Sequence, residues 1–181
     1  MWCLLNRSGK LETRDVALSA VLAALYAGLV VALAPISFYV FQVRVADALL
    51  PLSAVLGWPA VVGFTVGCFL GNLAGVLAGM PSGTVLIDAT GGSFANFLGC
   101  YLAYRLASGS EDKKRLLAST FAITAVITAI VGTYLPLLLG LPLWMGWLGI
   151  FLGSFVSINI MGYLVLLAFL RARLRSFRGT P

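Results

Sequence analysis

The run AVVGFTVGCFLGNLAGVLAG at residues 60–79 contains no charged side chain and has glycine at every fourth position. At about 1.5 Å per residue, about 20 helical residues cover the roughly 30 Å hydrocarbon core of a bilayer. The glycines form one ridge along such a helix: Gly63, Gly67, Gly71, Gly75 and Gly79. In lipid, a ridge of small residues lets two helix backbones approach closely, and this contact favours association. The stretch therefore predicts a transmembrane helix that packs inside a helical bundle.

The rest of the chain is equally apolar. Of its 181 residues, 61% are hydrophobic and 10% are charged, and the mean hydropathy is +1.03. A soluble domain has roughly 45–50% apolar and 25% charged residues. We therefore predict an all-α, polytopic membrane protein with six transmembrane helices in a single membrane domain over residues 1–181. The predicted helices cover residues 16–34, 43–56, 60–79, 88–106, 116–139 and 144–170.

Lysine and arginine gather in three segments, which precede the first predicted helix, join the fourth to the fifth, and follow the sixth. With six spans these segments share one face, and the positive-inside rule makes that face cytoplasmic. We therefore predict a multi-pass protein of the plasma membrane with both termini in the cytoplasm. A cleaved signal peptide is the competing interpretation of the N-terminus, but it would scatter the cations over both faces. The cations are Arg7, Lys10 and Arg14, then Arg105, Lys113, Lys114 and Arg115, then Arg171, Arg173, Arg175 and Arg178.

Outside those segments the ionisable residues are Arg44, Asp47 and Asp88. A charge at mid-membrane costs about 2.5–3.5 kcal/mol on insertion scales, so such residues point to function. Helix lengths place all three near the outer boundary, with Asn72 and Asn96 about 12 Å below it. So much polarity at one end of the bundle predicts an outward-facing pocket for a small polar molecule.

Further candidates lie around this set. Asn159 is expected deeper, at about 22 Å, and Gln42, Phe38 and Tyr39 belong to a loop that can close over the pocket. Each polar residue also has a structural alternative. Arg44 and Asp47 can form a local ion pair, Asp88 can be the N-cap of its helix, and the asparagines can be hydrogen-bonded between helices.

The composition also excludes several chemistries. The chain has no histidine, and Cys3, Cys68 and Cys100 are scattered as small hydrophobes rather than paired in a metal motif. It has no nucleotide-binding motif and no nucleophile–base pair. We predict a protein that is not an enzyme, needs no cofactor or metal, binds no nucleic acid, and is poorly equipped to drive the movement of a solute alone.

Three segments resemble the QueT family of S components in energy-coupling-factor (ECF) transporters. Residues 42–49, QVRVADAL, are similar to its Q-V-R-x-S-E-A-L segment, with Asp47 in place of Glu. Residues 87–96, IDATGGSFAN, resemble its D-x-x-x-G-S-x-A-T stretch, and residues 63–68, GFTVGC, resemble G-L-x-x-G-C. The likeness in layout covers about residues 14–172.

The resemblance implies an S-component-like bundle that captures a queuosine precursor from outside, a 7-deazaguanine such as preQ1, preQ0 or queuine. It also implies two kinds of partner, a transmembrane T component and two cytoplasmic ATPases. The small-residue ridge on the first helix, at Ala20 and Ala24, is the predicted partner contact. The candidate ligand-binding residues are Gln42, Arg44, Asp47, Asn72, Asp88, Asn96, Asn159, Phe38 and Tyr39. The alternatives are an S component for another vitamin-like solute, and a membrane scaffold subunit without a transport role.

Overall fold

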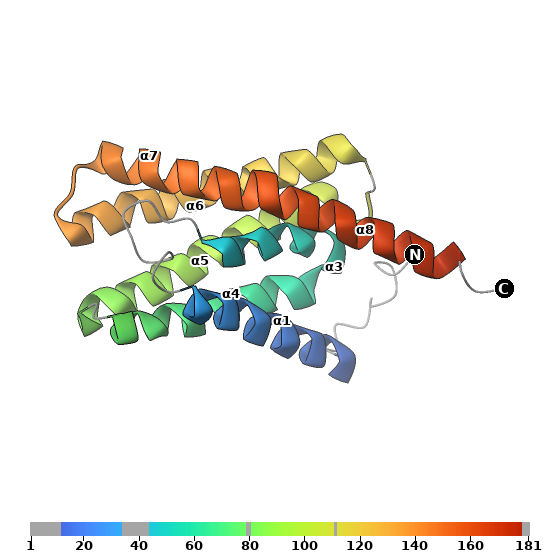
Figure 1. Ribbon diagram of the computed structural model, residues 1–181, viewed down its shortest axis with the longest axis horizontal. Coiled ribbons are helices and arrows are strands. Elements are labelled where there is room, and N and C mark those ends of the chain that lie inside the picture. Colours follow the sequence, from blue (N-terminus) through green and yellow to red (C-terminus); the bar gives the residue numbers. More distant parts are fainter. Residues whose placement is uncertain (1–11, 34–43, 79–80, 111, 179–181) are drawn as a thin grey trace.

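The computed structural model describes residues 12–33, 44–78, 81–110 and 112–178, and over these residues the chain is helical. Six helical bodies follow one another (Figure 1). They are α1 (Thr13–Ala32); η1 (Val45–Leu52) with α3 (Ser53–Leu56); α4 (Trp58–Leu73) with η2 (Ala74–Ala78); α5 (Ser82–Ala107); α6 (Lys113–Leu139); and α7 (Leu143–Ser154) with η3 (Phe155–Gly162) and α8 (Tyr163–Arg178). The prediction of an all-α membrane bundle is confirmed.

Four of these bodies are long and apolar enough to cross a membrane: Thr13–Ala32, Trp58–Val76, Lys113–Leu139 and Leu143–Arg173. The helix α5 is 26 residues long, but Asp88, Ser93 and Asn96 make it more polar. The body at Val45–Leu56 has 12 residues, and eight at about 2.0 Å with four at about 1.5 Å give about 22 Å, close to the length of the predicted span at 43–56. This length is less than the roughly 30 Å of a hydrocarbon core.

The start of α5 also corrects the sequence-based bounds. The helix begins at Ser82 rather than at residue 88, so Asp88 lies about 9 Å inside it. The alternative that Asp88 is an N-cap is therefore wrong. The other bodies begin within three residues of their predicted starts where those starts are described, and the last continues to Arg178.

The glycine ridge packs α4 against α1. A Cβ atom added to Gly63 would lie 2.7 Å from the carbonyl oxygen of Ser19. One added to Gly67 would lie 2.7 Å from the carbonyl oxygen of Ala23, and one at Gly71 would meet the Val30 Cβ at 2.9 Å. Real Cβ atoms do not approach backbone so closely, so the α1–α4 contact requires glycine at Gly63 and Gly67, whereas at Gly71 the Val30 side chain would have to shift. The prediction of a ridge used for packing inside the bundle is confirmed.

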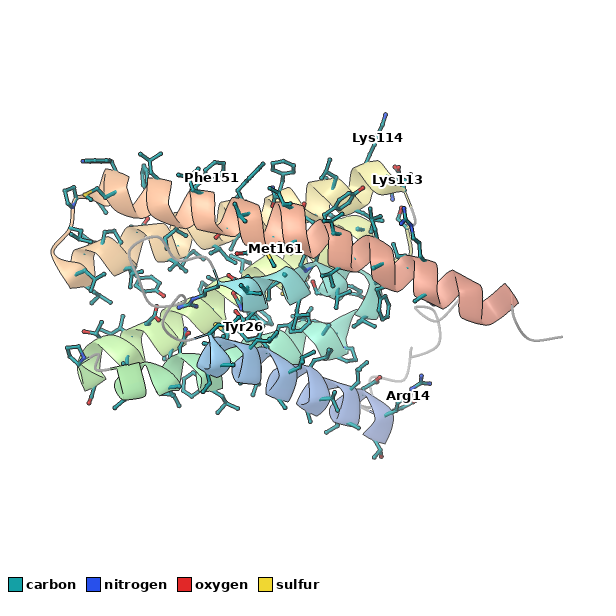
Figure 2. All side chains as sticks on the ribbon, viewed as in Figure 1. Arg14, Tyr26, Lys113, Lys114, Phe151 and Met161 are labelled. Atoms are coloured by element: carbon teal, nitrogen blue, oxygen red, sulfur yellow. The ribbon has the colours of Figure 1, made fainter. Side chains whose placement is uncertain are left out.

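The cationic segments meet at one end of the bundle. The start of α1, the turn between α5 and α6, and the end of α8 lie at the same end in Figure 1. Figure 2 shows Arg14, Lys113 and Lys114 projecting there. The turns that join α4 to α5 and α6 to α7 lie at the opposite end.

The short body formed by η1 and α3 occupies the middle of the bundle. It contacts α1, α4, α5, α6, η3 and α8. Pro51 lies inside η1, and a proline ring excludes the carbonyl of the residue four positions earlier, which explains why this segment is a 3₁₀ rather than an α-helix. Gly162, at the end of the π-helix η3, lets η3 and η1 approach each other closely. A Cβ atom at Gly162 would lie 2.9 Å from the Pro51 Cγ. The residues that follow Arg44 are thereby held at the centre of the fold.

Candidate ligand-binding site

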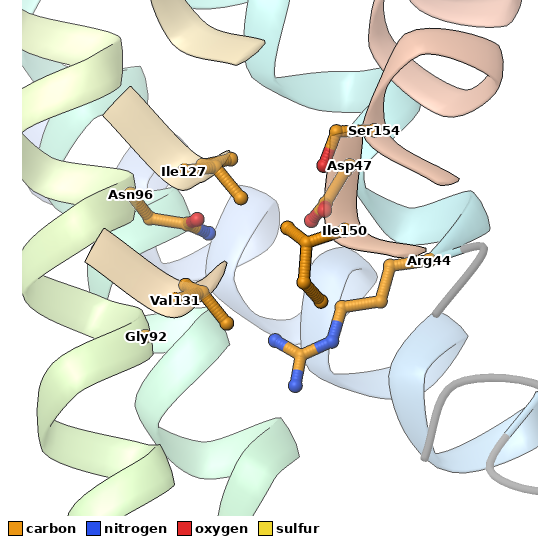
Figure 3. A pocket seen from close by; sticks show the side chains of 8 residues that line it. All are labelled: Arg44, Asp47, Gly92, Asn96, Ile127, Val131, Ile150 and Ser154. Atoms are coloured by element: carbon orange, nitrogen blue, oxygen red, sulfur yellow. The ribbon is translucent and has the colours of Figure 1, made fainter. Parts of the chain in front are cut away.

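A small cavity lies where η1 faces α5, α6 and α7. Figure 3 shows Asn96, Ile127 and Val131 on one side of it, with Arg44, Asp47 and Ser154 on the other. Gly92 and Ile150 complete the lining. The space holds about one water molecule. Three polar residues predicted from the sequence, Arg44, Asp47 and Asn96, therefore converge on one cavity.

Asp47 is held by a hydrogen-bond chain that begins on α5. The Asn96 Nδ2 donates to the Tyr26 hydroxyl at 3.0 Å, and that hydroxyl donates to the Asp47 Oδ1. Tyr26 is completely buried on α1, and only 4% of Asp47 is exposed. A buried carboxylate is costly unless it receives hydrogen bonds, so Tyr26 stabilises Asp47 at the cavity wall.

Asp88 makes a different set of contacts. Its Oδ2 forms a salt bridge with an Arg44 guanidinium nitrogen at 3.2 Å, and its Oδ1 accepts a hydrogen bond from the Tyr134 hydroxyl at 2.7 Å. Both charged residues are buried, with 6% of Arg44 and 2% of Asp88 exposed. Arg44 is thus balanced by a carboxylate on another helix, and the pair joins the start of η1 to α5.

Two adjacent glycines of α5, Gly91 and Gly92, leave room for Tyr134 and Asn72 beside Asp88. A Cβ at Gly91 would lie 2.8 Å from the Tyr134 ring, and one at Gly92 would lie 2.8 Å from the Asn72 Nδ2. That amide nitrogen donates to the backbone oxygen of Asp88 at 3.1 Å. Asn72 therefore supports the backbone beside Asp88 and is not among the cavity-lining residues.

The chain is similar to a known protein family over most of its length. A model of the QueT transporter family matches residues 16–171, which is most of the chain. The chain belongs to the QueT transporter family. It is therefore a membrane transporter protein and not an enzyme. No curated protein and no solved structure matches the chain.

Among the remaining predicted residues of this QueT family member, those that the structure describes do not line the cavity. The Asn159 Oδ1 accepts a hydrogen bond from the Thr124 hydroxyl at 2.6 Å, which fits the alternative of an interhelical bond, and Asn159 does not line the cavity. Ala20 and Ala24 are exposed on α1. The predictions for Gln42, Phe38 and Tyr39 lie outside the described residues.

Sequence reasoning missed the two tyrosines that hold the carboxylates. Tyr26 and Tyr134 each occur within a long apolar helix, and a buried tyrosine hydroxyl usually has a hydrogen-bond partner. That rule could have marked them as members of the polar set. The apolar wall residues Ile127, Val131 and Ile150 carried no such signal, because every predicted helix contains many similar residues.

Proposed function

We propose that this protein is the substrate-binding S component of an ECF-type importer and that its cavity binds a queuosine precursor from outside. The observation that carries the proposal is the convergence of Arg44, Asp47 and Asn96, all buried, on one cavity inside a QueT family bundle. Intramembrane charges are costly, so their concentration around a space supports a role in recognition.

The chemistry of these groups suits the guanine edge of a 7-deazaguanine. That edge presents an amino group and a ring N–H side by side, followed by a carbonyl oxygen. A carboxylate can accept both N–H groups together, while a guanidinium can donate to the carbonyl. Arg44 and Asp47 supply both functions in the cavity lining, and the aliphatic side chains of Ile127, Val131 and Ile150 offer surfaces for the faces of a flat base.

The size of the cavity adds a condition. A space for about one water molecule does not hold a bicyclic base. Binding therefore requires the lining elements to separate beyond the described arrangement. We expect a conformational change to accompany ligand binding. A ligand that binds the folded protein and not the unfolded chain should still stabilise the bundle against unfolding.

A ligand panel tests the proposal. The purified protein is titrated with preQ1, preQ0, queuine, guanine, biotin, riboflavin and thiamine, and its thermal melting is followed. A 7-deazaguanine should raise the melting temperature in a saturable way, while the others should not. Saturable binding of a different vitamin would support an S component for that solute. No saturable ligand at all would favour the scaffold alternative.

The proposal includes an orientation in the plasma membrane. The end of the bundle that carries Arg14, Lys113 and Lys114 is expected in the cytoplasm, where two ATPases act through a T component. A cysteine introduced at Ser110 should react with an impermeant maleimide only after permeabilisation, whereas one at Ser82 should react in intact cells. Labelling of Ser110→Cys from outside would overturn the six-span topology.

The partner contact is proposed for the outer face of α1, which is the exposed side of the helix turned away from the bundle. Ala20 and Ala24 are exposed, and Gly28, one turn further, has nothing within 4 Å of an added Cβ. Small residues at this spacing allow another helix to pack closely. The buried face of α1, which includes Ala23 and Tyr26, is already used inside the bundle.

A further inference from the structure

We propose that Asp47 is the carboxylate that accepts the two neighbouring N–H groups of the ligand, and that Asp88 is the structural counter-ion of Arg44. This inference rests on the proposed function and deepens it, because it assigns different roles to two buried carboxylates. It also makes Tyr26 a positioning residue, since Tyr26 acts on the ligand through Asp47.

Both carboxylate oxygens of Asp88 already have a partner inside the protein. One of its oxygens accepts from Tyr134 at 2.7 Å, and the other is paired with Arg44 at 3.2 Å. Its backbone oxygen receives the Asn72 amide. Asp88 is also absent from the cavity lining, although Arg44 is part of it. The contacts of Asp88 therefore orient Arg44 beside the cavity.

Asp47 has the opposite arrangement. It lines the cavity, and the hydrogen bond that the described residues give its carboxylate is the one from Tyr26 to Oδ1. An ionised carboxylate can accept about four hydrogen bonds, so it has capacity left for a ligand. The Asn96 amide fixes the Tyr26 hydroxyl from the other side at 3.0 Å. Asp47 is thus oriented by α1 and α5 while it faces the cavity.

The two tyrosines provide a matched pair for testing this assignment. Each donates one hydroxyl hydrogen bond to one buried carboxylate, Tyr26 to Asp47 and Tyr134 to Asp88. Substitution by phenylalanine removes one oxygen atom in either case. If Asp47 contacts the ligand, loss of the Tyr26 hydroxyl should weaken binding more than loss of the Tyr134 hydroxyl.

The direct test pairs a protein variant with a ligand variant. Binding of preQ1 and of its analogue without the 2-amino group is measured for the parent and for Asp47→Asn. The parent should bind the analogue about thirty-fold or more weakly, because the carboxylate loses one of its two donors. Asp47→Asn should bind preQ1 weakly and should discriminate between the two compounds by less than about three-fold. Equal discrimination by both proteins would overturn the assignment.

The tyrosine variants decide the question even if Asp47→Asn does not fold. We expect Tyr26→Phe to weaken preQ1 binding by about five- to tenfold, in line with one lost hydrogen bond to a charged group. Tyr134→Phe should weaken it less than Tyr26→Phe does, because Arg44 keeps its salt bridge with Asp88. The reverse order would assign ligand recognition to Asp88 while leaving the proposed function intact. Absence of any 7-deazaguanine binding by the parent would overturn both proposals.

Discussion

The contact between α1 and α4 and the polar interior around η1 are both buried, but they are built in opposite ways. In the first, glycine brings two backbones together, so that even one added carbon atom at Gly63 or Gly67 would collide with a carbonyl oxygen. In the second, polar side chains such as Arg44, Asp47 and Asn96 surround a space for about one water molecule. The first region has no room to rearrange, whereas the second has contacts that side-chain rotation can remake.

A similar close contact joins α6 to α7. A Cβ at Gly146 would collide with the Pro136 ring and would lie 2.7 Å from the carbonyl oxygen of Gly132. The tightly packed α6–α7 unit therefore borders the cavity on one side. The η1 segment lies between the α6–α7 unit and the α1–α4 unit. We expect the opening that admits a ligand to occur around η1, while the two glycine-mediated contacts persist.

The largest loss of folding stability should come from a substitution in the polar interior around η1. Asp88→Asn removes the salt bridge between Asp88 and the buried Arg44 guanidinium, and removal of one member of a buried ion pair costs about 3–5 kcal/mol. The measurement is the unfolding free energy in detergent or lipid. The double variant Arg44→Met with Asp88→Asn is the control and should recover part of the loss. Strictly additive losses would contradict a coupled pair.

A smaller loss is expected from the packed region. Gly67→Ala places a carbon atom against the Ala23 carbonyl oxygen, and overpacking of this kind costs about 1–3 kcal/mol. Gly28→Ala is the matched control, because nothing lies within 4 Å of the added atom. Thermal melting of the two variants checks the comparison, and equal melting temperatures would show that the α1–α4 contact adapts easily.

The smallest effect on stability should come from the outer face of α1. Ala24→Leu should leave folding and ligand binding unchanged, because this residue is exposed, yet it should abolish uptake by holding a partner helix away. Uptake by cells and ligand affinity of the purified protein are measured in parallel. Ala24→Ser keeps the side chain small and should transport normally. Normal uptake by Ala24→Leu would remove this face from the partner interface.

Much of the fold could be predicted from the sequence because a membrane span requires only length and apolarity. The runs at 60–79 and 116–139 are read directly, and the packing role of Gly67 follows from its spacing. The start of α5 could not be read in the same way. Residues 82–87, SGTVLI, contain no feature that separates a turn from a first helical turn, so Asp88 was expected at the helix start.

The candidate site was predictable as a set of residues but not as a set of contacts. Charge in a hydrophobic setting identifies Arg44, Asp47 and Asp88 without any coordinates. Which carboxylate faces Arg44 depends on how α5 and η1 rotate about their axes, and tertiary packing sets that rotation. The partners Tyr26 and Tyr134 follow from the same rotation, which explains why spacing along the chain did not reveal them.

The π-helix η3 has a consequence for how this chain tolerates insertions and deletions. It spans Phe155–Gly162, between the cavity residue Ser154 and the helix α8. A π-helical turn contains about one residue more than an α-helical turn, so deletion of a single residue there can be absorbed as regular α-helix. Everything on one side of the deletion would then rotate by about 100° relative to the other. Asn159 would turn away from Thr124, or Ser154 would turn away from the cavity. A one-residue deletion in this segment could therefore keep the helix continuous and still misalign the residues on its two sides.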